Sequence, residues 1–164
     1  MVFFMQHSGV GLGVFGVPAA VANPLAMLKA MESGSPSLAQ ALANGKPTVI
    51  DFYADWCENC RAMAPVMSSL EKAYGEKINF VVVDGDSEVN YPLVDAFRVD
   101  GIPHLAMVTK RGEVETALVG VVPQKVVEDD IKALIADSKL PYAGFDAFAG
   151  REHRIEWADG IKIE

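Results

Sequence analysis

The sequence predicts an α/β protein with one central sheet and helices on both of its faces. Short apolar runs rich in β-branched and aromatic residues alternate along the chain with segments whose apolar residues recur at helical spacing. An alternation of this kind builds a sheet that is covered by helices. With 164 residues, 51% of them hydrophobic, the chain is long enough for one packed domain and too short for two of ordinary size.

The amino-terminal segment is apolar. Residues 1–28 contain no Lys, Arg, Asp or Glu, and the run has the length that a single membrane span requires. Its glycines and prolines make it a poor helix, and it lacks the basic flank of a signal or anchor. We expect residues 1–32 to precede the folded domain as a candidate membrane anchor or as the remnant of a targeting segment, and we favour the anchor.

The folded domain is expected to span residues 33–140, because the run SGSPS at 33–37 is typical of a linker. Ser37 caps a short helix that the following Asn-Gly dipeptide closes. The run PTVIDFYA at 47–54 follows as a strand, since it is short, apolar and rich in β-branched and aromatic side chains.

A long helix is predicted from Cys57 to Gly75, with Pro65 inside it, where the missing backbone donor predicts a kink. The remaining elements are, in order, a buried strand at 78–86, a short helix at 91–99, a hairpin of strands at 104–109 and 113–119 joined at 110–112, and an amphipathic helix at 123–139. Residues 141–164 form a carboxy-terminal tail that has aromatic residues but no clear period.

Composition excludes several classes of function. The chain has 14 Lys and Arg against 22 Asp and Glu, a net charge of -8, and no basic run, so nucleic acid is not an expected partner. Its two cysteines are too few for the disulfide framework of a small secreted scaffold. No metal site is expected, because structural zinc needs four ligands and the three histidines are scattered along the chain.

The two cysteines point to redox chemistry. Cys57 falls where a strand ends and a helix starts, so the free amides and the positive end of the helix dipole face its sulfur. That environment stabilises a thiolate and makes Cys57 the expected nucleophile. Cys60, one turn further along the same helix face and less exposed, is the expected resolving thiol. Beyond this redox-active pair we expect no cofactor.

The run VIDFYADWCENCRAMAP, together with GIPHL and GEVETALVG, resembles the thioredoxin superfamily over about residues 37–138. The resemblance implies the thioredoxin fold with a central mixed sheet, and it implies that Asp51 is the buried proton acceptor for the resolving cysteine. It also implies a cis peptide bond before Pro103, which lines the groove where a partner docks. The residues expected to bind the partner are Trp56, Ile102, Pro103, His104 and Gly120.

Four runs, ALANGKPTVIDFYADWC, RAMAP, VDGIPH and LPYA, resemble the thioredoxin-like proteins of cyanobacteria and their membrane-anchored counterparts in plant thylakoids, which serve cytochrome b6f assembly. This implies a reductase of disulfide-containing proteins or apocytochromes, supplied with electrons by a membrane thiol relay. The implied location is the thylakoid membrane, with the domain facing the lumen. A soluble plastid protein or a bacterial protein is the alternative.

Three departures from the common thioredoxin pattern bear on the chemistry. Glu58 and Asn59 stand between the cysteines, so a negative charge opposes the Cys57 thiolate, while Arg61 acts in the opposite direction. A less stable thiolate makes a more reducing pair, and we expect a reductant. Val82 stands where many thioredoxins have a lysine, which predicts a raised pKa for the buried aspartate.

Histidine follows the expected cis proline, and two interpretations of it stay open. His104 either tunes the thiols or is a half-exposed strand residue. Two alternatives to the reductase also remain. In the first, the dithiol belongs to a disulfide oxidant or to a dedicated cytochrome c maturation reductase. In the second, the domain is a non-catalytic assembly module.

Overall fold

The computed structural model describes residues 23–142 and 144–146. Its helices and strands follow in the order α1 (Pro24–Gly34), α2 (Leu38–Ala43), β1 (Thr48–Tyr53), α3 (Glu58–Tyr74), β2 (Asn79–Asp84), the 3-10 turn η1 (Glu88–Asn90), α4 (Tyr91–Ala96), β3 (His104–Val108), β4 (Val114–Val119), α5 (Gln124–Ile135) and β5 (Phe145–Asp146). Every strand and helix predicted between residues 37 and 139 is present, with ends that differ by a few residues.

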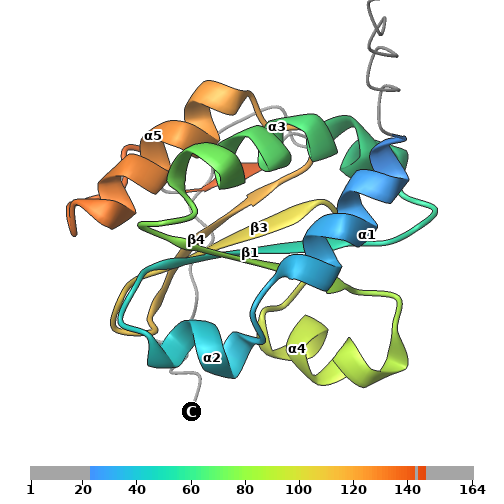
Figure 1. Ribbon diagram of the computed structural model, residues 1–164, viewed down its shortest axis with the longest axis horizontal. Helices are drawn as coiled ribbons and strands as arrows, with labels where there is room; N and C mark the ends of the chain where they lie inside the picture. The colour runs from blue at the N-terminus through green and yellow to red at the C-terminus, as the bar shows by residue number, and fades with distance from the viewer. Residues whose placement is uncertain (1–22, 143, 147–164) are drawn as a thin grey trace, which may run out of the picture.

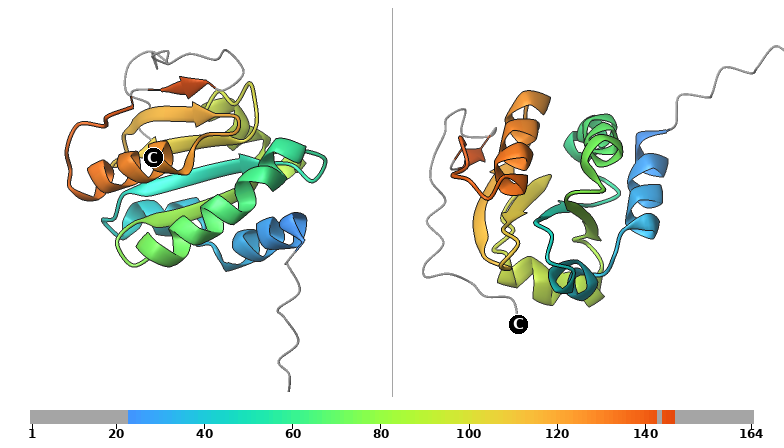
Figure 2. Two further views of the ribbon diagram at one scale, coloured as in Figure 1. Left: turned by 90° about the horizontal axis from the view of Figure 1, so that it is seen from above. Right: turned by 60° about the vertical axis from the view of Figure 1, so that its left-hand side comes forward.

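The five strands form one mixed sheet in the order β2-β1-β3-β4-β5. The β1–β2 and β4–β5 pairs are parallel, whereas the β1–β3 and β3–β4 pairs are antiparallel. Helices α3 and α5 cover one face and α2 and α4 cover the other, while α1 lies beside α3 (Figure 1; Figure 2). The predicted α/β architecture with helices on both faces is confirmed.

Strand β1 is buried along its whole length and separates two hydrophobic cores. Val49 and Tyr53 belong to the core beneath α1, α3 and α5. Ile50 and Phe52 belong to the core on the α2 and α4 side. Because side chains alternate between the two faces of a strand, Asp51 points to the same side as Val49 and Tyr53, which is the side of α3.

Helix α1 corrects the expected start of the domain at residue 33. The side chain of Asn23 accepts a hydrogen bond from the amide of Leu25 at 2.9 Å and so caps α1, and Pro24 occupies its first turn. Leu28, 1% exposed, and Met31 lie in the core beside α3. The helical spacing of the apolar residues in α1 could not be recognised in the sequence, because the uncharged run before α1 is also apolar and continues directly into it.

The expected linker SGSPS is therefore the end of α1 and the turn into α2. Residues 1–22, which hold most of the expected membrane anchor, lie outside the described residues. From α1 to α5, none of the helices that the structure describes has the length and apolar character needed to cross a bilayer.

The chain after α5 returns to the sheet at the start of residues 141–164, the segment that we expected to form a carboxy-terminal tail. Leu140 is buried in the core, and the amide of Tyr142 donates to Asp130 Oδ1 at 3.0 Å. Two residues then pair in parallel with β4 as the edge strand β5. A strand of this length leaves no periodicity that a sequence pattern can reveal.

Candidate redox site

The dithiol sits at the amino end of α3, as the sequence predicts. Cys57 is the residue that precedes the first turn of α3, and its sulfur accepts a hydrogen bond from the amide of Cys60 at 3.1 Å. The amide of Cys57 donates to the carbonyl oxygen of Ala54 at 3.1 Å, which turns the chain from β1 into the helix. The Cys57 sulfur therefore lies where free amides and the helix dipole favour negative charge.

The two cysteines form a disulfide with an S–S distance of 2.14 Å. Cys57 is 4% exposed and borders a groove in the surface, whereas Cys60 is 1% exposed and lies in the core beneath α3. A partner sulfur approaching through the groove thus meets Cys57 first. This order of access matches the expected division into attacking and resolving thiol.

Asp51 is buried on the side of the sheet that carries the dithiol. Its side chain is 3% exposed, and its strand neighbours are Val82 of β2 and Leu105 of β3. Within the described part of the chain, its Oδ1 has no hydrogen-bond partner. Burial in these apolar surroundings raises the pKa of Asp51 to about 7, so the carboxyl group can exchange a proton near neutral pH.

The loop before β3 has the expected cis peptide bond between Ile102 and Pro103. The amide of Gly120, at the end of β4, donates to the carbonyl oxygen of Pro103 at 2.8 Å. Gly120 adopts a φ of 90°, a region that favours glycine. This hydrogen bond joins Gly120 to Pro103, far apart in the sequence, next to Ile102, which lines the groove.

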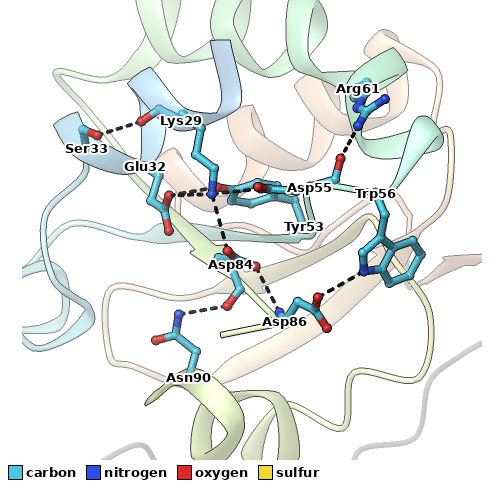
Figure 3. A network of polar contacts seen from close by, with 10 residues as sticks. All are labelled: Lys29, Glu32, Ser33, Tyr53, Asp55, Trp56, Arg61, Asp84, Asp86 and Asn90. Carbon is cyan, nitrogen blue, oxygen red and sulfur yellow. Dashed lines mark hydrogen bonds and ion pairs between the residues drawn. The ribbon is translucent and has the colours of Figure 1, made fainter. Parts of the chain in front are cut away.

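The groove has a volume of about 610 Å³ and runs from the dithiol to the loop before β3. Trp56 stands at its edge with 65% of its surface exposed, and its indole Nε1 donates to Asp86 Oδ2 at 3.3 Å (Figure 3). Glu58, Asp86 and Asp100 line the groove, and none of its lining residues in the described structure is Lys or Arg. The surface offered to a partner therefore combines aliphatic side chains and the exposed Trp56 ring with three carboxylates.

His104 does not lie where we expected. Its side chain is buried on the α2 and α4 side of the sheet, with its ring edge-on to Phe52 at a centroid distance of 5.7 Å. Burial lowers the pKa of His104 to about 4, so the ring is neutral at pH 7. The expectation of a half-exposed residue is wrong, and the side chain faces away from the side that holds Asp51 and the dithiol.

One polar network beside the site was missed from the sequence. Lys29 of α1 contacts Asp55 and Asp84, and the Asp84 carboxylate accepts from the amide of Asp86, whose own carboxylate accepts from the Trp56 indole (Figure 3). Lys29 is the first charged residue after the apolar run. That position in the sequence was the available sign that Lys29 meets other charged residues. It could not be interpreted while α1 was assigned to a segment outside the domain.

Comparison with known proteins adds to this geometry. A family model described as Thioredoxin matches residues 31–133. The thiol:disulfide interchange protein TxlA homolog of Synechocystis is 42% identical over 116 residues, which cover 71% of this chain and 64% of that protein. The chloroplastic thioredoxin-like protein HCF164 of Arabidopsis thaliana is 40% identical over 117 residues, which cover 71% of this chain and 45% of that protein.

Solved structures are also similar. The oxidised form of mitochondrial thioredoxin 3 from Saccharomyces cerevisiae superposes with a TM-score of 0.52 at 28% sequence identity, covering 58% of this chain and 85% of that one. The chain spans only part of the length of the two curated relatives above, 64% and 45% respectively.

Proposed function

Because the chain belongs to the thioredoxin family, we propose that it is a disulfide oxidoreductase that reduces disulfides of partner proteins through Cys57 and Cys60. The observation that carries this proposal is the disulfide at the amino end of α3, with Cys57 at the edge of the groove and Cys60 behind it. The pair supplies both electrons, and the reaction needs no further cofactor.

Each turnover starts from the reduced dithiol. The Cys57 thiolate attacks one sulfur of the partner disulfide, the partner S–S bond breaks, and the leaving sulfur takes up a proton. Cys60 then loses its proton and attacks the Cys57 sulfur of the mixed disulfide. The intramolecular disulfide forms, the second partner thiol leaves, and two electrons have passed to the partner.

Asp51 is the proposed proton acceptor for Cys60. It lies on the side of the sheet that carries α3, and its raised pKa of about 7 lets it take a proton at neutral pH and return it later in the cycle. Val82 lies opposite Asp51 on β2, so β2 places no cation next to the Asp51 carboxylate.

The proposed direction is reduction of the partner. Glu58 is exposed in the first turn of α3, directly after Cys57, and its charge opposes the thiolate. Arg61 donates a hydrogen bond to the carbonyl oxygen of Asp55, which fixes its guanidinium close to the loop before Cys57. The carboxylates along the groove outnumber this one cation and favour the oxidised, uncharged pair.

We further propose that the domain acts in the thylakoid lumen on disulfides or apocytochromes of cytochrome assembly, with electrons delivered by a membrane thiol relay. Similarity to the TxlA homolog and to chloroplastic HCF164 supports this location. The part of the uncharged run that precedes α1, residues 1–22, suits attachment to a membrane. On this proposal Trp56 and Ile102 line the site that receives the partner, and Pro103 and Gly120 shape the loop beside it. His104 contributes only through its backbone in β3, because its side chain faces the other side of the sheet.

Two measurements test the function. Equilibration of the purified protein with glutathione should give a reduction potential below about -200 mV, and a value well above it would indicate a disulfide oxidant. Cys60→Ser should trap partner proteins as mixed disulfides on Cys57, whereas Cys57→Ser should trap fewer through Cys60. A Cys57→Ser protein that keeps full activity in cells would point to the non-catalytic assembly module.

The proton role of Asp51 has its own test. Asp51→Asn should slow the resolution of a preformed mixed disulfide at pH 7 by about tenfold, because general base catalysis contributes at least that much in comparable sites. Rapid quenching with acid and mass analysis would follow the mixed disulfide directly. Unchanged resolution would remove Asp51 from the mechanism.

A further inference from the structure

Lys29 gathers three acidic side chains and one aromatic ring around a single ammonium group. Its Nζ lies 2.8 Å from Asp55 Oδ1, 3.4 Å from Asp84 Oδ2 and 3.7 Å from Glu32 Oε2. The same nitrogen lies 5.2 Å from the centroid of the Tyr53 ring, whose hydroxyl donates to Glu32 Oε2 at 2.8 Å. These contacts raise the pKa of Lys29 above its ordinary value, with the hydrogen bond to Asp55 as the largest cause.

Two separate routes lead from Lys29 to Trp56. The first follows the chain, because Asp55 directly precedes Trp56. The second runs through hydrogen bonds: Asp84 Oδ1 accepts from the amide of Asp86 at 3.0 Å, and Asp86 Oδ2 accepts from the Trp56 indole at 3.3 Å. Figure 3 shows the two routes meeting at the exposed ring.

The loop before Cys57 is held at a second point. Arg61 of α3 donates to the carbonyl oxygen of Asp55, while Lys29 binds the carboxylate of the same residue. Asp55 is thus fixed between α1 and α3, which pack against each other over the edge of the sheet (Figure 2). Lys29 itself precedes the first residue matched by the family model.

We propose that Lys29 is a positioning residue for partner docking: by holding Asp55 and Asp84 together, it fixes Trp56 at the edge of the groove beside Cys57. Without the ammonium group, the carboxylates of Glu32, Asp55 and Asp84 face one another with no compensating charge, and their repulsion separates the loop before Cys57 from the end of β2. Trp56 then keeps its hydrogen bond to Asp86, and Arg61 keeps its contact with the Asp55 carbonyl, but the two sides that hold the ring are no longer fixed relative to each other.

The test compares Lys29→Met with Lys29→Arg and with Lys125→Met in a Trp157→Phe background, so that Trp56 is the single tryptophan. Lys125 is the matched control, because it forms an exposed ion pair with Asp129 at 2.6 Å on α5 and its loss changes the net charge equally. Acrylamide quenching of Trp56 is measured in the oxidised protein. Kinetic constants for the reduction of insulin are measured with dithiothreitol as electron donor.

Lys29→Met should increase the quenching of Trp56 and raise KM for insulin by about 3- to 10-fold with kcat changed by less than twofold. Lys29→Arg should restore most of both properties, and Lys125→Met should leave them as in the parent protein. The proposal is overturned if Lys29→Met matches the parent in quenching and KM, or if Lys125→Met has the same effect.

The kinetic part of this inference rests on the proposed function, whereas the quenching of Trp56 does not. Reduction of the small disulfide 4,4'-dithiodipyridine by the reduced protein reports on the dithiol alone and should be equal in all variants. A protein that fails this assay disproves the proposed function and leaves the quenching result intact. If Lys29→Met does not fold, Asp55→Ala removes the shortest contact of Lys29 while α1 stays intact, and it should also increase the quenching of Trp56.

Discussion

Asp51 of β1 lies directly across the parallel register from Val82 of β2, so the buried carboxyl group faces an apolar side chain. β2 places no cation at this position to hold the aspartate ionised, and burial raises the pKa of Asp51 from 3.8 to about 7.

A first prediction concerns stability and pH. Because the pKa of Asp51 is higher in the folded state than in the unfolded chain, the folded protein binds this proton more tightly, and stability falls as pH rises from about 4 to about 7. Asp51→Asn removes the cost of the buried charge. It should raise the free energy of unfolding at pH 8 by an amount on the order of 4 kcal/mol, with the difference vanishing towards pH 4.

Urea unfolding of the oxidised proteins at several pH values measures this difference. Asp95→Asn serves as the control, because Asp95 is exposed on α4. Burial also raises the pKa of Asp130 to about 7, so the difference between variant and parent, rather than the parent curve alone, reports on Asp51. A constant difference between pH 4 and pH 8 would contradict the assignment.

A second prediction concerns Glu58. Replacing it with glutamine removes the negative charge next to the nucleophile, so the thiolate becomes more stable. Glu58→Gln should lower the pKa of the Cys57 thiol by about half a pH unit and make the reduction potential less negative by ~10 mV. Thiolate absorbance at 240 nm and glutathione equilibration measure the two quantities. Glu76→Gln, just beyond the carboxy end of α3, should change neither.

A third prediction concerns Gly120. At its φ of 90° an alanine is strained, and the strain falls where the amide donates to Pro103. Gly120→Ala should lower the free energy of unfolding by about 1 to 2 kcal/mol and weaken insulin reduction. Gly34→Ala is the control, because a Cβ at this last residue of α1 meets nothing within 4 Å. Equal effects of the two substitutions in denaturant unfolding would show that the conformation of Gly120 is unimportant.

A fourth prediction tests whether α1 belongs to the cooperative unit. Leu28 is 1% exposed and packs in the same core as α3, so Leu28→Ala should lower the free energy of unfolding by about 2 to 4 kcal/mol. Leu25→Ala should cost less, since its side chain is only partly buried against that core. Thermal or urea unfolding decides the matter, and a parental midpoint for Leu28→Ala would mean that α1 is not part of the folding unit.

The sequence predicted those features that depend on local patterns. The position of Cys57 and Cys60 at a helix start, the strand containing Asp51 and the hairpin closed by Gly112 all follow from short-range chemistry. The cis bond before Pro103 and its nearness to Gly120 came from resemblance to a family, because no local rule joins residues so far apart in the chain.

What could not be predicted depends on tertiary packing. Nothing in the run around His104 indicates which face of the sheet its side chain occupies, since the register with Phe52 is fixed only when β1 and β3 pair. The role of Lys29 needed the packing of α1 against α3 to be known. Its partner Asp55 lies in the loop between β1 and α3, and Asp84 lies at the end of β2. Their spacing in the sequence does not indicate that they meet.

The position of Lys29 on α1 affects where this domain can be truncated. A fragment trimmed to the limits of the family match would begin at residue 31 and discard both Leu28 and Lys29. Such a shortened protein would keep its two cysteines and still react with small thiol reagents. If Lys29 positions Trp56 as proposed, the fragment would bind partner proteins more weakly than the whole domain does, because Lys29 precedes the residues matched by the family model.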